Sequence, residues 1–373
     1  MTKKRIAISA NTSWNIYNFR IPLIHFLQKN GYEVIAVAPE GEATALIEQK
    51  GIPVHILRFL ERKGTNPVNE IKLINEYVQA YKKQSIDLAL NFTIKPNIYG
   101  AIAANRIGIP STATVTGLGH TFISKGISST VAKQLYKMAF RKANRVIFQN
   151  EDDRSLFESM KLASAEKTLI IPGSGIDTNH FSSVAYPDFE KEFNFLFVGR
   201  LLFDKGMREL DAAFQQIAGK HPQAHLHIVG SIDNNNPAAY SQEALEQLTQ
   251  QPNVHFHGRV DDPRPFLANC HCVVLPSYRE GLPRVIHEAM ATARPAIVTD
   301  VPGCRQTVKH GYNGFQVAVK DAAALAAAMH QIIEIPHQER IQMGQNGRKM
   351  AEDTFEAQIV NQKYLEVCRQ LLS

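Results

Sequence analysis

Residues 277–290 read Ser277-Tyr278-Arg279-Glu280-Gly281-Leu282-Pro283, then Arg-Val-Ile-His, then Glu288-Ala289-Met290. One apolar run, 273–276, precedes this stretch, and another, 295–298, follows it. The pattern predicts a strand, a tight turn, a helix and a second strand. Open α/β sheets bind ligands beyond the carboxyl ends of their strands, so we expect a ligand site at this turn.

The turn and the helix after it carry groups suited to a nucleotide sugar. Pro283 suits the first helical turn, where the amide that it lacks would be unpaired. Backbone N–H groups near Gly281 and Leu282, with the positive end of the helix dipole, predict a phosphate site. Glu288, more than one turn deeper, is placed to accept two hydrogen bonds from a ribose diol. Glu280, at the rim, is placed to do the same for sugar hydroxyls.

Two glutamates eight positions apart in this context resemble the Glu-x7-Glu signature of retaining nucleotide-sugar glycosyltransferases. The whole chain of 373 residues resembles family 4 of that group. The resemblance implies an α/β chain of the GT-B fold, with two Rossmann-like parallel sheets facing across a cleft. It implies an acceptor-binding domain over 1–185, a donor-binding domain over 186–355, and a terminal helix over 356–373 that returns to the first domain. It also implies UDP as the donor nucleotide, with no metal and no cofactor.

The rest of the chain shows the same alternation of short apolar segments and helical patterns. Expected strands in the first half are 6–10, 33–38, 54–57, 86–90, 112–116, 145–148 and 169–172. Expected strands in the second half are 195–199, 225–229, 254–256, 272–275, 296–299 and 315–317. A turn- and charge-rich stretch, 173–193, separates the two sets. Strands separated by helices predict parallel sheets with right-handed crossovers.

The first strand of the second half leads into Gly199-Arg200-Leu-Leu-Phe-Asp-Lys205-Gly206. This loop resembles the family loop in which Arg and Lys stabilise the departing diphosphate without a metal. The resemblance implies the catalytic residues Arg200, Lys205, Glu280 and His120. The implied donor site is Gly199, Arg200, Lys205, Ser231, Arg259, Val260, Ser277, Glu280, Gly281, Leu282, Pro283 and Glu288.

The first domain is expected to hold the acceptor. The loop after its first strand lacks the glycine pair of many relatives. Its Ile16-Tyr-Asn-Phe-Arg20 run instead resembles family 4 enzymes that act on polyprenyl-diphosphate-linked sugars. Arg20 has the alternative of a salt-bridged helix residue, and His120 that of a structural histidine. The implied acceptor site is Asn15, Arg20, Gly117, Gly119 and His120.

The net charge of +6 lies in the first half, where residues 1–190 hold 23 Lys and Arg against 16 Asp and Glu. No acidic residue occurs between Asp87 and Glu151. This basic segment indicates an anionic partner, either a phosphate-bearing acceptor or an anionic membrane surface. In its helical part we expect apolar residues to pack inward and basic ones to face lipid headgroups. The apolar set is Val131, Leu135, Met138 and Ala139, and the basic set is Lys133, Lys137, Arg141 and Lys142.

Other features narrow the class of protein. The basic segment between Asp87 and Glu151 shows no platform of aromatic side chains on which the bases of a nucleic acid would stack. No signal-peptide core or membrane-spanning run is apparent, so we expect a cytoplasmic protein with peripheral contact to the inner face of the membrane. The four cysteines lack zinc-site spacing and are expected to be buried free thiols.

The predicted function is transfer of a hexose or N-acetylhexosamine from a UDP-sugar to a lipid-linked glycan, in polysaccharide, O-antigen or glycoprotein biosynthesis. The absence of a DxD motif excludes the metal-dependent transferase fold. A dehydrogenase is disfavoured because no Gly-x-Gly-x-x-Gly follows the first strand. Two alternatives stay open: a UDP-sugar epimerase on the same fold, and a non-catalytic scaffold that binds nucleotide sugar.

Overall fold

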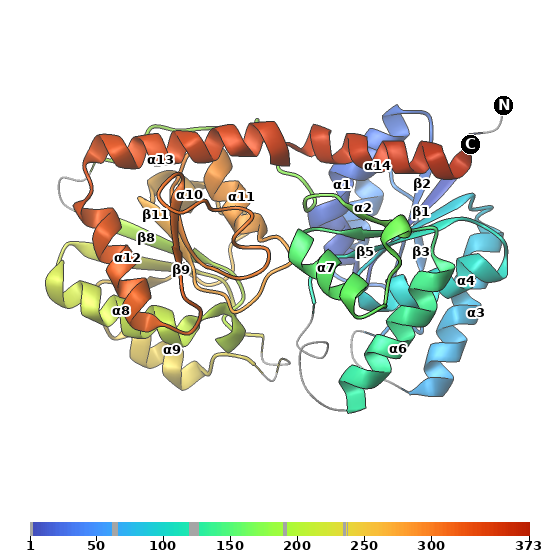
Figure 1. Cartoon of the computed structure of the whole chain (residues 1–373), viewed down its shortest axis with the longest axis horizontal. Coiled ribbons are helices and arrows are strands. Elements are labelled where there is room, and N and C mark those ends of the chain that lie inside the picture. The colour runs from blue at the N-terminus through green and yellow to red at the C-terminus, as the bar shows by residue number, and fades with distance from the viewer. Residues whose placement is uncertain (1–2, 62–65, 119–126, 189–191, 234–235, 237) are drawn as a thin grey trace. The chain divides into compact units, whose positions relative to one another are not determined.

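The computed structural model describes residues 3–61, 66–118, 127–188, 192–233, 236 and 238–373. The chain forms two compact units, one of residues 1–175 with 357–373 and one of residues 176–356. Each unit is built around a parallel β-sheet covered by helices (Figure 1). The prediction of two Rossmann-like α/β sheets is confirmed.

The first unit holds a seven-stranded sheet in the order β3-β2-β1-β4-β5-β6-β7, with all pairs parallel. The strand order reverses between β1 and β4, which makes the carboxyl ends of these two strands the place where such sheets bind ligands. The strands are β1 Arg5–Ser9, β2 Glu33–Ala38, β3 Val54–Ile56, β4 Leu88–Phe92, β5 Ser111–Val115, β6 Arg145–Phe148 and β7 Thr168–Ile170.

Helices cover both faces of this sheet and bury one apolar core on each. The terminal helix α14 packs beside α1, and its Tyr364 lies against Phe92 of β4, with 5.8 Å between ring centroids. The chain therefore ends on the sheet with which it begins, as predicted. The helices are α1 Ser13–Lys29, α2 Thr44–Gln49, α3 Pro67–Lys83, η1 Pro96–Gly100, α4 Ala101–Arg106, α6 Ile127–Lys142, α7 Glu151–Ser159, η2 Ala165–Lys167 and α14 Ala357–Leu372.

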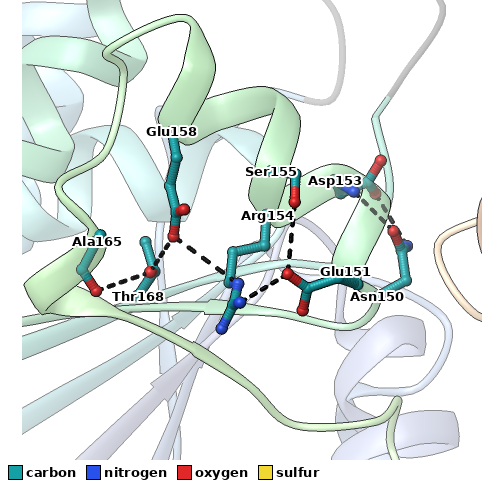
Figure 2. Close-up of polar contacts among 8 residues, drawn as sticks. All are labelled: Asn150, Glu151, Asp153, Arg154, Ser155, Glu158, Ala165 and Thr168. Atoms are coloured by element: carbon teal, nitrogen blue, oxygen red, sulfur yellow. Dashed lines mark hydrogen bonds and ion pairs between the residues drawn. The ribbon is translucent and has the colours of Figure 1, made fainter.

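Helix α7 shows how local sequence fixes an element that leaves the carboxyl edge of this sheet (Figure 2). Asn150 caps it: its Oδ1 accepts from the amide of Asp153 at 2.8 Å, and its Nδ2 donates to the Asp153 carboxylate at 3.1 Å. Arg154 then pairs with Glu151 at 2.6 Å, and Glu158 accepts a hydrogen bond from Thr168 at the start of β7. These contacts satisfy the first turn and tie the helix to the next strand.

One expected strand is displaced. The prediction placed it at 86–90, whereas β4 runs from Leu88 to Phe92. The amide of Ile86 donates to the carbonyl of Tyr81 in the last turn of α3, at 2.9 Å, so this residue closes the helix. Asn91 belongs to the strand although it is polar, because its buried amide donates to the carbonyl of Thr112 at 3.1 Å.

The second unit holds a six-stranded parallel sheet in the order β10-β9-β8-β11-β12-β13. Here the order reverses between β8 and β11. The strands are β8 Phe193–Val198, β9 Ala224–Val229, β10 Val254–Phe256, β11 Cys272–Leu275, β12 Ala296–Thr299 and β13 Gly314–Val317. The helices are η3 Phe203–Lys205, α8 Met207–Lys220, α9 Gln242–Thr249, α10 Arg264–Asn269, α11 Arg284–Ala291, α12 Ala322–Glu334, α13 His337–Met350 and η4 Ala351–Phe355.

Candidate functional site

In the second unit, the loops that follow β8 and β11 meet at the reversal of strand order. Lys205, from the loop after β8, forms an ion pair with Glu280, from the loop after β11. Their side chains are 22% and 13% exposed, so the pair is accessible to a ligand without being fully solvated. An anionic ligand can compete with Glu280 for the ammonium group and leave the carboxylate free to accept sugar hydroxyls.

Two glycines allow the backbones at this point to approach closely. Gly206 has φ +76°, and a Cβ built on it would lie 2.1 Å from the carbonyl oxygen of Pro276. Gly303, after β12, has φ +83°, and its Cβ would lie 2.6 Å from the carbonyl oxygen of Glu280. A side chain at Gly206 would displace the backbone at Pro276, and one at Gly303 would displace the backbone of Glu280 itself, so the position of the Glu280 loop depends on both glycines.

Glu288 lies one helical turn inside α11 and is 8% exposed. Burial raises the pKa of its carboxyl group, and Arg284 opposes that rise by donating a hydrogen bond from Nε to Oε1 at 2.9 Å. Glu288 is therefore a buried hydrogen-bond acceptor whose negative charge is stabilised by the neighbouring guanidinium of Arg284. Such a carboxylate is suited to accept hydrogen bonds from a diol. Pro283, expected in the first helical turn, instead occupies the N-cap with an extended ψ of 116°.

Further contacts fix the surrounding loops. Arg200 forms an ion pair with Asp233 at 3.0 Å, and Tyr278 donates to Glu209 of α8 at 2.9 Å. Ser277 is fully buried, and its Oγ has no hydrogen-bond partner among the described residues. Burial raises the pKa of Tyr278 to about 12, so its hydroxyl stays protonated at neutral pH and donates.

The remaining predicted donor residues lie at the same edge of the sheet. Gly199 directly follows β8, and its amide donates to Val229 at 2.9 Å. Ser231 follows β9 and is exposed, and Arg259 with Val260 follows β10. Gly281 and Leu282 connect Glu280 to the N-cap of α11. All the predicted donor residues therefore follow β8, β9, β10 or β11 at their carboxyl ends, or belong to α11.

In the first unit, the predicted acceptor residues do not all share one environment. Asn15 lies in the first turn of α1, and its buried Oδ1 has no hydrogen-bond partner among the described residues. Arg20 is 3% exposed, with its guanidinium carbon 3.9 Å from the centroid of the Phe92 ring. Gly117 follows β5, whereas Gly119 and His120 lie outside the described residues.

The structure adds Thr93, which the sequence analysis missed, to this edge. Thr93 follows β4 and has φ +70°, a strained conformation for a β-branched residue. Its Oγ1 accepts from the amide of Asn11, at 3.1 Å, in the loop after β1. The π-helix η1 begins three residues later, at Pro96, and Asn97 within it pairs with the backbone of Thr114. The sequence Thr93-Ile-Lys-Pro96 could have indicated that the strand ends near Thr93, because proline is excluded from the interior of a sheet.

Helix α6 differs from the prediction in which residues face outward. Ala139 and Phe140 are buried, but Val131 and Met138 are 51% and 42% exposed. The expectation that these two pack inward is therefore wrong, because aromatic side chains occupy that face instead. A shallow hollow of about 430 Å³ lies along the outer face, lined by Gln134, Lys137, Met138, Arg141 and Lys142.

Two family models together match most of the chain. The Glycosyl transferase 4-like model matches residues 5–150, and the Glycosyl transferases group 1 model matches residues 180–350. The chain is a glycosyltransferase.

Relatives that are similar to most of this chain agree with the assignment. The N,N'-diacetylbacillosaminyl-diphospho-undecaprenol alpha-1,3-N-acetylgalactosaminyltransferase of Campylobacter jejuni is 28% identical over 97% of this chain and 98% of its own. The UDP-Gal:alpha-D-GlcNAc-diphosphoundecaprenol alpha-1,3-galactosyltransferase of Escherichia coli is 25% identical over 72% and 71%. Anabaena HepE in complex with UDP has the same fold, with a TM-score of 0.79, 22% identity and coverage of 99% and 100%.

Two other features of the glycosyltransferase bear on its surroundings. Among the described residues, no helix is long and apolar enough to span a bilayer. The four cysteines, Cys270, Cys272, Cys304 and Cys368, are buried and free, as predicted.

Proposed function

We propose that this glycosyltransferase moves a hexose or N-acetylhexosamine from a UDP-sugar to a polyprenyl-diphosphate-linked glycan, with retention of anomeric configuration. The observation that carries the proposal is the Lys205–Glu280 pair at the strand-order reversal of the second unit. A cation for a diphosphate and a carboxylate for sugar hydroxyls lie side by side there. The names of the Campylobacter and Escherichia relatives specify diphospho-undecaprenol acceptors, and the latter specifies UDP-galactose.

The proposed reaction needs no metal and no cofactor. The bond between the anomeric carbon and the phosphate oxygen breaks, and the acceptor hydroxyl forms the new bond on the same face of the sugar. The leaving diphosphate takes the proton of the acceptor. Lys205 and Arg200 stabilise the charge that develops on the diphosphate, Glu280 orients the sugar, and Glu288 holds the ribose.

The acceptor is proposed to bind at the carboxyl edge of the first unit, where Asn15 lies in the first turn of α1 and Thr93 lies on the loop after β4. Helix α6 is proposed to place this unit on an anionic membrane. Its outer face combines Lys137, Arg141 and Lys142 with the exposed apolar side chains of Val131 and Met138. Cations with interspersed apolar groups suit the headgroup region of a bilayer.

The first experiment measures UDP release from UDP-sugars, with and without an undecaprenyl-diphosphate-linked sugar. Acceptor-dependent release, lost in Lys205→Met and Glu280→Gln and retained in Lys349→Met, supports the transferase. Epimerised nucleotide sugar without acceptor would favour the epimerase, and binding without turnover would favour the scaffold. NMR of the product gives the anomeric configuration, and an inverted centre would refute retention.

Membrane contact has a separate test in flotation with vesicles that contain anionic lipid. The double substitution Lys137→Glu, Arg141→Glu is expected to abolish flotation. The matched control is Lys82→Glu, Lys83→Glu, at the exposed end of α3. Equal loss in both variants would show a general charge effect and refute a role specific to α6.

A further inference from the structure

The second unit carries a cluster of two imidazoles and a carboxylate away from the candidate donor site. His330 and Glu334 lie one turn apart on α12, and His221 caps the C-terminus of α8. One ligand atom from each residue lies within 4.8 Å of the other two. His221 Nε2 and His330 Nδ1 are 2.7 Å apart, and His221 Nδ1 lies 3.9 Å from Glu334 Oε1.

The packing of α8 on α12 holds these groups together. The two helices share a core that includes Phe214 and Ile217 of α8 and Met329 and Ile332 of α12. His221 is 8% exposed, and its amide donates to the carbonyl of Ile217 at 2.7 Å, so the backbone of this ligand is fixed. His330 and Glu334 are exposed, which gives an ion access from solvent.

The chemistry of the set suits a divalent transition metal. Two histidines and one glutamate form a known zinc ligand set that leaves a fourth position for water. Tetrahedral zinc holds two imidazole nitrogens about 3.3 Å apart, given Zn–N distances of roughly 2.0–2.1 Å. The pair at 2.7 Å therefore has to open by a few tenths of an ångström, and the exposed His330 side chain can turn to allow it.

We propose that His221, His330 and Glu334 bind a zinc ion that joins the C-terminus of α8 to α12. The role is structural, because α8 has 14 residues and its other end, beside Lys205, is on the order of 20 Å away. Zinc would stiffen the helix whose first turn borders the candidate diphosphate site.

A second histidine cluster provides an internal control. His225, His227, His255 and His257 lie on β9 and just after or within β10, in cross-strand pairs 2.9 and 3.0 Å apart. Within the described part of the chain, the His221 group is the one set of three that gathers its ligand atoms closely enough for a single ion.

The test uses untagged protein treated with EDTA, then titrated with zinc by calorimetry and followed by thermal unfolding. We expect one zinc per chain and a rise in Tm of roughly 5–10 °C at zinc a hundredfold above its Kd. His330→Ala and Glu334→Gln should each weaken binding at least tenfold, and His255→Ala should leave it unchanged. Both substituted side chains are exposed, so each variant should keep the wild-type Tm in EDTA.

Other outcomes overturn the proposal. Failure of the wild-type protein to bind zinc would do so, and so would binding that survives both His330→Ala and Glu334→Gln. Binding lost in His255→Ala alone would place the ion on the other cluster. Because UDP binding is measured separately on the same variants, failure of the zinc site leaves the proposed transferase function unaffected.

Discussion

Replacing Arg284 by alanine tests whether a guanidinium keeps the buried Glu288 carboxylate charged. The pair is joined by a 2.9 Å hydrogen bond on one face of α11, and Glu288 is 8% exposed. Removing one partner of a buried ion pair typically costs about 3–5 kcal/mol. The Arg284 side chain is 35% exposed, so water recovers part of that loss, and we expect a cost of about 2 kcal/mol at pH 7.5. This corresponds to a decrease in Tm of roughly 4–8 °C.

The cost should depend on pH in a defined direction. Burial raises the folded-state pKa of Glu288, so its contribution to stability is greatest in acid and falls as pH rises through that pKa. Arg284 lowers this pKa, so its removal makes the loss of folding stability larger at neutral pH. The difference between Arg284→Ala and wild type should therefore be largest at pH 7.5 and shrink toward pH 5.

The assay is unfolding at both pH values for Arg284→Ala, Glu288→Gln and the double variant, with UDP affinity measured in parallel. Glu288→Gln removes the charge, so adding Arg284→Ala to it should cost far less than 2 kcal/mol. UDP affinity of Arg284→Ala should fall about tenfold, the value of one charge-assisted hydrogen bond. A stability difference that is equal at both pH values, together with additive effects in the double variant, would refute the reasoning.

Three further predictions concern stability. Gly206→Ala should destabilise the second unit by more than 1 kcal/mol, because its φ is +76° and the new Cβ meets Pro276. Gly219 lies in α8, and a Cβ built on it has no atom within 4 Å, so Gly219→Ala should raise the free energy of unfolding by about 0.5–1 kcal/mol. Both variants are compared by denaturant titration, and equal effects of Gly206→Ala and Gly219→Ala would contradict this prediction. Asn97→Ala leaves two backbone groups of Thr114 unpaired and should cost about 3 kcal/mol; a loss below 1 kcal/mol would show that water replaces the amide. The pKa of His227 is lowered to about 4 by burial and by neighbouring histidines, so stability should fall by about 1–2 kcal/mol between pH 6.5 and 4. His227→Asn should flatten that slope, and an unchanged slope would assign it to other groups.

The sequence predicts most clearly the elements whose apolar pattern is undisturbed. Strand β11, the turn at Glu280 and helix α11 follow from two apolar runs around a Gly-Pro turn. The strand predicted at 86–90 begins and ends two residues before β4, because the polar Asn91 does not fit an apolar strand pattern. Asn91 belongs to the strand because its buried side chain donates a hydrogen bond to the carbonyl of Thr112 on the neighbouring strand. The outward direction of Met138 on α6 was missed because the helix packs through aromatic residues, Tyr136 and Phe140, that compete for the same face.

The partners of the site residues were harder to predict than the residues themselves. Arg284 could be predicted from the sequence as the partner of Glu288, since it precedes Glu288 by four positions and both fall on one helix face. Asp233, the partner of Arg200, lies 33 residues away in another loop, and local pattern gives no distance between the two. Such pairs become visible only when strand order is known.

Strand order also explains why the two motif loops meet. Strands β8 and β11 are separated along the chain by β9 and β10, yet they are neighbours in the sheet. Crossovers run in opposite directions from this pair, so the loops after β8 and β11 begin side by side and lead to helices on opposite faces of the sheet. Lys205 and Glu280, 75 residues apart in sequence, meet where these two loops begin. The same reversal between β1 and β4 brings Asn11 beside Thr93 in the first unit. The equivalence of the two positions is the physical reason to test Thr93 as an acceptor contact: Thr93→Ala should raise the KM for the lipid-linked sugar and leave UDP affinity unchanged.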